Sequence, residues 1–297
     1  MKNNFSIIAH ATETKKAENQ DDGGCFSGTN FNALFIADGL GSYKYAKKSS
    51  EVVINFFKAK ADEFNSSEQP QNSIPIFNSV FQGAKQKLID YANENFTEEE
   101  KKEDNLLGTT AISIFETKDK IKISYTGNGA VFHIRANFNE FPEFYLFPWN
   151  AINLLNPHTI PEKGKEALYK LISNSSDFDE CIPSIIEIEK DKSMGEIIMI
   201  CTDGVFSPDQ VKAGKNDKGI WVKYENSITE FFKHINHFFK TVQDYNSENL
   251  LEILKLYLSQ IKPTLDDDAT LAVLITNEAL NYQRQKHTVS NESHLDN

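Results

Sequence analysis

The sequence has few cysteines and no long apolar run, and each of these absences excludes a class of protein. Its three cysteines, Cys25, Cys181 and Cys201, are an odd number without Cys-X-X-Cys spacing. They predict neither a disulfide framework nor a zinc site, and they favour a reducing compartment. No apolar stretch approaches the roughly 20 residues that cross a bilayer, and the first residues lack the pattern of a signal peptide. We therefore expect a cytoplasmic protein without a membrane partner.

Basic residues are also in the minority, with 31 Lys and Arg against 43 Asp and Glu and a formal net charge of −12. An acidic chain without a basic block is a poor ligand for nucleic acid or an anionic membrane. Its partners are expected to be cations or other proteins. The 297 residues, 39% of them hydrophobic and 22 of them Phe, can bury a sizeable core. Length alone leaves one large domain or two small ones open.

Short apolar runs predict seven strands. They lie near Phe5, before Asp38, and from Thr109, Lys120, Ala130, Glu196 and Ala269. The run from Lys120 alternates apolar and polar residues, and the three runs from 109 to 136 follow one another closely, which predicts an antiparallel meander. The runs from Glu196 and Ala269 are continuously apolar, as in central strands covered on both faces.

Apolar residues at helical spacing predict helices from Ser49, from Ile76, and from Leu250 to Ile261, where Pro263 ends the last one. Helices grouped between hairpin-linked strands favour an α+β layered domain over a wound parallel sheet. We expect one domain over residues 1–278, with an irregular insertion at 138–193 that includes a short helix within 156–173. Residues 279–297 are expected to form a polar, frayed tail.

Three of the predicted strands have an aspartate at one end: Asp38, Asp203 and Asp267. If these strands are neighbours, the carboxylates converge and repel one another unless cations lie between them. A site made of oxygen ligands suits Mg²⁺ or Mn²⁺, and a glycine after an aspartate lets its carbonyl approach a metal. Asp-Gly is also a common turn dipeptide. The pattern alone leaves a metal site and ordinary turns equally open.

Six short motifs follow one another along the chain: NQDD from Asn19, IADGLGS from Ile36, GTTA from Gly108, TGNGAVFHI from Thr126, CTDG from Cys201 and DDAT from Asp267. In this order the sequence resembles the bacterial branch of the metal-dependent serine/threonine protein phosphatases of type 2C, from about Ile7 to Ile275. The resemblance implies a sandwich of two antiparallel β-sheets flanked by pairs of α-helices, with a metal site at one end. It also implies dephosphorylation of phosphoserine and phosphothreonine in a protein substrate, hence a role in signalling. The sequence names neither the substrate nor the opposing kinase.

By this resemblance the site holds two Mn²⁺ or Mg²⁺ ions. The implied ligands are Asp38, which bridges both ions, the Gly39 carbonyl on one ion, and Asp203 and Asp267 on the other. Two such ions lower the pKa of a shared water, which can attack the phosphorus directly. Gln20 and Asp21 are expected to support the metal-bound water and the ligands from behind. Because no covalent phosphoenzyme is needed, Cys201 is interpreted as a small core residue.

The sequence departs from the family pattern at several positions. Lys16 stands where an arginine usually grips the substrate phosphate, and lysine lacks the bidentate fork. A solvated surface lysine is the alternative interpretation. Leu40 replaces the histidine that eukaryotic members carry as a proton donor. Asn128 and Ser207 replace two aspartates that hold a third metal in many members, so we expect that third site to be weak or absent.

These departures keep other hypotheses open. The chain could be a catalytically weak or silent phosphatase-fold module that binds a phosphoprotein or another regulator. It could also hydrolyse small phosphoesters. His234 and His237 could form a metal pair, although the phenylalanines around them favour ordinary helix-face histidines. His158 would approach the site if the insertion folds over it.

Overall fold

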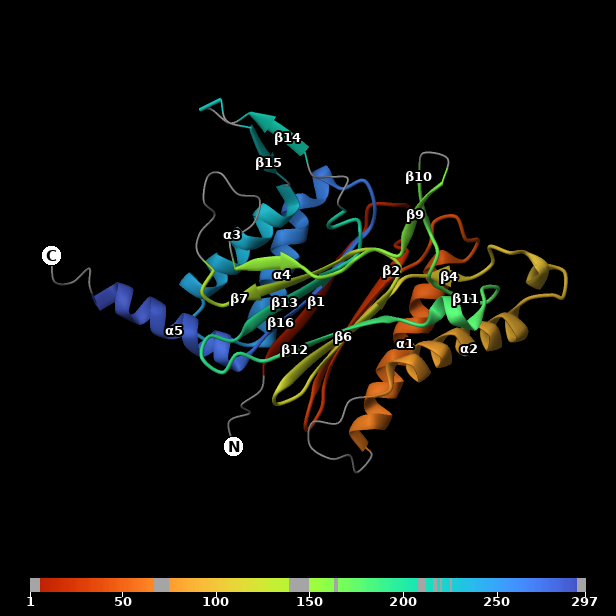
Figure 1. Cartoon of the computed structure of the whole chain (residues 1–297), viewed down its shortest axis with the longest axis horizontal. Helices are drawn as coiled ribbons and strands as arrows, with labels where there is room; N and C mark the ends of the chain where they lie inside the picture. Colours follow the sequence, from red (N-terminus) through yellow and green to blue (C-terminus); the bar gives the residue numbers. More distant parts are fainter. Residues whose placement is uncertain are drawn as a thin grey trace.

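Two five-stranded antiparallel sheets form the centre of the molecule, as expected (Figure 1). The computed structural model describes residues 6–66, 75–138, 150–162, 165–207, 212–215, 218–219, 221–224 and 226–292. The first sheet has the order β1 (Ile7–Glu13), β16 (Ala269–Ile275), β13 (Glu196–Cys201), β7 (Ala130–Arg135) and β8 (Ala151–Asn153). The second has the order β12 (Ser184–Glu189), β6 (Lys120–Thr126), β5 (Ala111–Glu116), β3 (Asn32–Asp38) and β2 (Asp21–Ser27).

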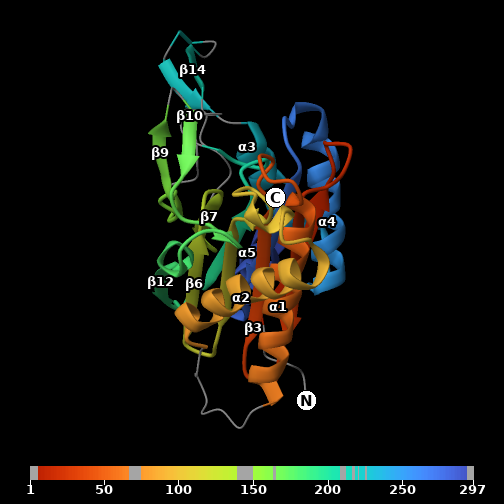
Figure 2. The same cartoon turned by 90° about the vertical axis from the view of Figure 1, so that its right-hand side faces the viewer.

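Helices cover the outer faces of both sheets, and Figure 2 shows α1 and α2 together on one side. The helices are α1 (Ala46–Ser66) and α2 (Phe77–Asn95) on the second sheet, and α3 (Asn226–Thr241), α4 (Ser247–Ile261) and α5 (Asn277–Glu292) on the first. The shorter elements are η1 (Glu100–Lys102), β4 (Gly108–Thr109), β9 (Thr159–Glu162), β10 (Lys165–Leu168), β11 (Ile172–Ser173), η2 (Phe178–Cys181), β14 (Lys212–Lys215), β15 (Trp221–Tyr224) and η4 (Lys262–Thr264).

Three apolar layers hold this arrangement together. Side chains such as Ile36 and Ile198 fill the space between the sheets. Phe57 and Phe81 pack between the second sheet and its helices. Tyr257, on α4, packs in the apolar layer outside the first sheet, against Phe231 of α3. Each fully buried side chain of this size contributes about 1.5–3 kcal/mol relative to exposure. The predicted central strands β13 and β16 lie inside the first sheet, with buried side chains throughout.

The predicted three-stranded meander is wrong in its last step. β5 and β6 form a hairpin, but β7 leaves them and pairs with β13 in the other sheet. Gly127 and Gly129 precede β7 with φ of 93° and 103°, which L-residues with a Cβ rarely adopt. These two glycines turn the chain out of one sheet and into the other.

The insertion and the C-terminal segment also differ from expectation. The short helix expected within 156–173 is instead the hairpin of β9 and β10, followed by β11. Pro161 and Gly164 disfavour a helix in this run, so strand pairing decides its conformation. The expected frayed tail is helical up to Glu292 as part of α5, because Ala279 and Leu280 reach the apolar layer beside α3, and residues 293–297 lie outside the described residues.

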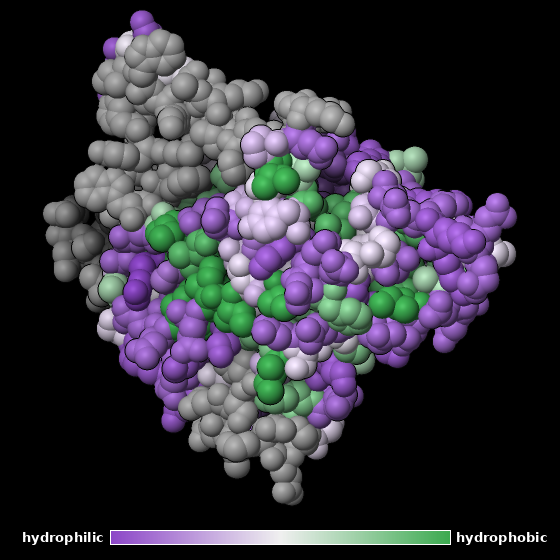
Figure 3. All heavy atoms as spheres, turned by 45° about the vertical axis from the view of Figure 1, so that its right-hand side comes forward, coloured by the Kyte–Doolittle hydropathy of each residue, from purple (hydrophilic) through white to green (hydrophobic). Residues whose placement is uncertain are grey.

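The insertion carries most of the large apolar side chains that the described surface exposes. They are Ile152, Ile160, Tyr169, Phe178 and Ile185. Figure 3 shows hydrophobic side chains gathered among hydrophilic ones on one face of the molecule. Among the helices that the structure describes, none is both long and apolar enough to cross a bilayer.

Candidate active site

Four aspartates from both sheets meet at one end of the sandwich. Asp21 begins β2 and lies opposite Asp38, the last residue of β3. Asp203 follows β13 and Asp267 precedes β16, and these two strands are neighbours in the first sheet. Asp38 interacts electrostatically with the other three. The three strand-end acids that the sequence singled out therefore converge, and Asp21 joins them. We call these four residues the acidic cluster.

Threonines fix the backbone and side chains of the acidic cluster. The Thr202 hydroxyl donates to Asp21 Oδ2 at 2.7 Å, which joins the two sheets. The Asp38 carbonyl accepts from the Thr109 hydroxyl at 2.8 Å and from the Thr110 amide at 2.8 Å. These two bonds hold the backbone of Asp38 at the end of β3. The GTTA motif thus positions Asp38.

The glycines after Asp38 and Asp203 are required by close backbone packing. A Cβ on Gly39 would lie 2.1 Å from the Ala46 carbonyl oxygen, at the start of α1. A Cβ on Gly204 would lie 1.9 Å from the Asp268 carbonyl oxygen. No side chain fits at either place, so each Asp-Gly pair does more than form a turn.

Burial in a shared negative field changes the acidity of the cluster. Burial raises the pKa of Asp21 to about 7, although the hydrogen bond from Thr202 acts in the opposite direction. Burial, and then the charges of Asp21 and Asp203, raise the pKa of Asp38 well above its usual range. Burial and Asp267 raise the pKa of Asp203 as well. The carboxylates therefore carry more negative charge than their surroundings stabilise.

Lys16 points into the acidic cluster. Its Nζ lies 2.5 Å from Asp267 Oδ1 and 2.9 Å from Gln20 Oε1. Partial burial would lower the pKa of Lys16, but Asp267, followed by Asp38, outweighs it and raises that pKa. The Lys16 side chain is 35% exposed, so it lies at the solvent-facing edge of the cluster, where it is paired with Asp267. Gln20 lies beside the cluster with its side chain bound to Lys16, and its expected support of a metal-bound water stays a prediction.

Asn128 contacts the acidic cluster from the turn before β7. Its Nδ2 donates to Asp203 Oδ2 at 2.7 Å. The neutral amide therefore stabilises the Asp203 carboxylate, where an aspartate at residue 128 would repel it. Ser207, the other expected departure, is half-buried and is the last residue described before the gap at 208–211.

Asp268 was missed by the sequence reasoning, although it stands in the DDAT motif. Its Oδ1 accepts from the backbone amides of Lys15 and Lys16, at 2.7 and 2.9 Å, and its Oδ2 accepts from the Gln20 amide at 2.9 Å. A buried carboxylate thus fixes the loop that carries Lys16. Three acids in succession just before a strand, Asp266 to Asp268, were the signal that could have indicated it.

The histidines lie outside the acidic cluster. His158 is buried; its Nδ1 accepts from the Gly127 amide at 3.2 Å, so its Nε2 donates to the Ser184 hydroxyl at 2.8 Å. It therefore supports the turn that carries Asn128. Burial, with Lys170, lowers the pKa of His158 to about 4. His234 is buried in α3 while His237 is exposed, so they form no metal pair.

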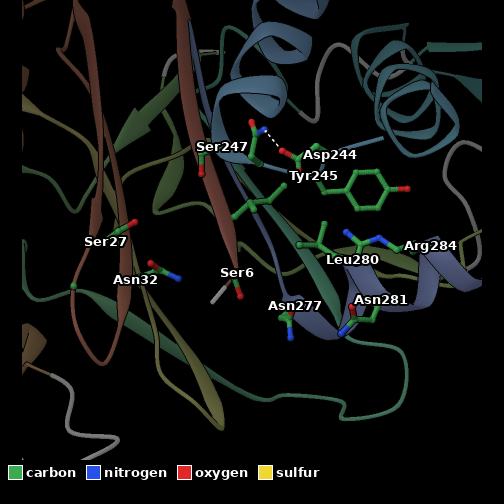
Figure 4. Close-up of a pocket in the computed structure, with 13 residues that line it drawn as sticks. Ser6, Ser27, Asn32, Asp244, Tyr245, Ser247, Asn277, Leu280, Asn281 and Arg284 are labelled. Carbon is green, nitrogen blue, oxygen red and sulfur yellow. Dashed lines mark hydrogen bonds between the residues drawn. The ribbon is translucent and has the colours of Figure 1, made fainter. Parts of the chain in front are cut away.

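A polar pocket of about 760 Å³ lies at the other end of the sandwich, where β1 and β3 begin (Figure 4). Its lining includes Asn32, Ser247 and Arg284. Asn32 and Asp38 are the two ends of β3, so about 20 Å separates the pocket from the acidic cluster. The pocket does not belong to the site.

The donors of the acidic cluster fit a hard divalent cation, because they are carboxylate oxygens whose mutual repulsion a cation would relieve. Over the described ranges, however, no group of three or more His, Cys, Asp or Glu side chains is arranged to hold a metal ion. Lys16 and Asn128 each bind one of the carboxylates instead. A divalent ion would therefore fit after a local side-chain rearrangement.

Comparison with known proteins agrees with this geometry. The family model for protein phosphatase 2C matches residues 10–255. The chain is similar to a bacterial serine phosphatase structure (18% identity, TM-score 0.59, 91% of this chain and 97% of that one). It is also similar to the serine/threonine phosphatase Stp1 from Staphylococcus aureus (16%, 0.57, 90% and 94%) and to RsbX in complex with magnesium (15%, 0.52, 93% and 97%). Among curated proteins, no match is found.

Proposed function

Because the chain belongs to the protein phosphatase 2C family, we propose that it is a Mn²⁺- or Mg²⁺-dependent protein phosphatase acting on phosphoserine and phosphothreonine. The observation that carries this proposal is the convergence of four aspartates from two sheets, three of which have raised pKa values. The magnesium in the similar RsbX structure supports the choice of metal. We also propose a cytoplasmic location, since none of the three cysteines, all within the described ranges, forms a disulfide.

In this proposal Asp38, Gly39, Asp203 and Asp267 would hold two ions. When bound, the ions supply an acidified water and neutralise phosphate charge. Asp21 holds Asp38 in register from the neighbouring strand. Asn128, bound to Asp203, would support at most a weak third site. Lys16 is the cation within the cluster that a substrate phosphate could meet.

A protein substrate is favoured over a small phosphoester by the insertion. His158, next to β9, binds the turn before β7, so the β9–β10 hairpin begins beside the acidic cluster. Ile160 and Tyr169 are both exposed there. Apolar surface near a phosphate site offers contacts to a polypeptide that a small phosphoester would not use.

The second candidate is a binding module without catalysis. It is favoured by the Asn128–Asp203 and Lys16–Asp267 contacts, which occupy two of the proposed ligands. In this case the fold would recognise a phosphoprotein or another regulator without hydrolysing it.

The deciding experiment measures phosphate release from a phosphothreonine peptide with Mn²⁺, beside an EDTA control. Asp203→Asn should abolish release, because it removes a proposed ligand charge, whereas Asp62→Asn on the exposed side of α1 should leave it unchanged. Circular dichroism verifies that both variants fold. If the folded, metal-loaded wild type releases no phosphate, the binding module replaces the enzyme. In that case the double variant Asn128→Asp, Ser207→Asp tests whether third-site carboxylates restore hydrolysis.

A further inference from the structure

The ammonium of Lys16 lies where a cation is needed. It bridges Asp267 Oδ1 at 2.5 Å and Gln20 Oε1 at 2.9 Å, and it interacts electrostatically with Asp38 and Asp268. The acidic cluster contains four carboxylates from neighbouring strand ends, which repel one another when charged. An ammonium at this distance from a carboxylate stabilises its charged form.

The position of Lys16 is prepared by the loop that carries it. Asp268 accepts three backbone hydrogen bonds from residues 15–20, which fixes the Lys16 backbone beside the cluster. Since these hydrogen bonds already fix the backbone, the contact of Lys16 with Asp267 costs only the rotamer freedom of the Lys16 side chain. Lys15 shares the same clamp, but its side chain is exposed and its Nζ lies only near the Lys262 carbonyl, at 3.4 Å.

We propose that Lys16 is a counter-cation built into the acidic cluster. Its ammonium binds Asp267 until a divalent ion displaces the ammonium. The displacement rests on the function proposed above; the role as counter-cation does not. An ammonium and a divalent ion repel each other, and both require Asp267 Oδ1. Lys16 therefore keeps the cluster stable without metal and lowers its affinity for the ion that Asp267 would bind. Once displaced, Lys16 is available to a substrate phosphate.

The test compares Lys16→Met with Lys15→Met, since each variant removes one positive charge from adjacent positions. Calorimetric titration with MnCl₂ should show about tenfold tighter Mn²⁺ binding to Lys16→Met than to Lys15→Met. In EDTA, Lys16→Met should unfold at a temperature about 2 °C or more below that of Lys15→Met. Lys16→Arg keeps the charge and should behave as wild type in both measurements. If Lys16→Met does not fold, Lys16→Gln, which keeps a hydrogen-bond donor, replaces it.

The two measurements separate this inference from the proposed function. Equal Mn²⁺ affinities of the Lys16 and Lys15 variants would overturn displacement. Equal unfolding temperatures in EDTA would overturn the role as counter-cation. If no variant and no wild-type sample binds Mn²⁺, the two-metal proposal and displacement both fail. In that case the unfolding temperatures of Lys16→Met and Lys15→Met in EDTA still test whether Lys16 acts as a counter-cation.

Discussion

Asn128 and Asp203 form a hydrogen bond of 2.7 Å between the turn before β7 and the end of β13. The amide donates to an oxygen of a proposed metal ligand, so a neutral side chain stabilises a partly buried carboxylate from one side. This contact joins two loops of the first sheet at the edge of the acidic cluster. A carboxylate introduced at residue 128 would therefore repel Asp203.

Asn128→Asp should destabilise the metal-free protein and strengthen its response to metal. The variant replaces a hydrogen bond to a charged group, which contributes about 1.5–3 kcal/mol, with repulsion between two carboxylates. Thermal unfolding in EDTA and in MnCl₂ measures both effects. Asn128→Ala, which loses the hydrogen bond without adding charge, is the control. If Mn²⁺ raises the unfolding temperature of both variants equally, the added carboxylate does not reach the ion.

Asp268→Ala should lower the free energy of unfolding by about 3 kcal/mol, because it leaves three backbone donors of the 15–20 loop without their acceptor. Urea denaturation measures this loss. Asp266→Ala, two residues away and exposed, should change stability by less than about 0.5 kcal/mol. Equal losses in the two variants would show that the three hydrogen bonds to Asp268 do not stabilise the 15–20 loop.

Gly39→Ala should destabilise the fold by about 1–3 kcal/mol, because the new Cβ would lie 2.1 Å from the Ala46 carbonyl oxygen. Gly41→Ala is the matched control, since its Cβ would approach no atom closer than 3.4 Å. Urea denaturation of both variants compares two glycines of the same motif. A Gly39 variant as stable as the Gly41 variant would show that the backbone can move apart there.

His158 should make stability fall as the pH falls from about 6.5 to 4. In the folded protein its pKa is about 4, against an ordinary value of 6.5, so the unfolded chain binds a proton first. The folded state is therefore at full stability above pH 6.5 and loses up to about 3 kcal/mol by pH 4. Urea denaturation at pH 7 and 4.5 should show a smaller difference for His158→Gln than for wild type. Protonation of Nδ1 removes the lone pair that accepts from the Gly127 amide, so parallel profiles would show that His158 does not cause the fall in stability.

The sequence predicted the elements whose own side chains decide their structure. β3, β13 and β16 are continuously apolar, and their terminal acids indicated the acidic cluster. β2 was missed because Asp21–Ser27 contains two aspartates and two glycines, which have low strand propensity. Pairing with β3 forms that strand. β12 was missed although its isoleucines and glutamates alternate as in a half-buried strand.

The contacts within the site were harder to predict from the sequence than its proposed metal ligands. Asp38 and Asp203 could be predicted from strand ends and motifs. The binding of Lys16 to Asp267 joins residues 251 positions apart, and no local pattern encodes it. The hydrogen bonds that Asp268 accepts from residues 15–20 likewise join distant parts of the sequence. Such contacts depend on which loops the stacked sheets bring together.

The geometry of the acidic cluster depends on the relative position of the two sheets, which the hydrogen bond from Thr202 to Asp21 joins. Asp21 and Asp38 move with one sheet, and Asp203 and Asp267 move with the other. A substitution in the apolar layer between them, such as one at Ile198, can slide one sheet by a fraction of an ångström and leave the fold intact. The distances between the carboxylates would then change, although the substituted residue lies outside the acidic cluster.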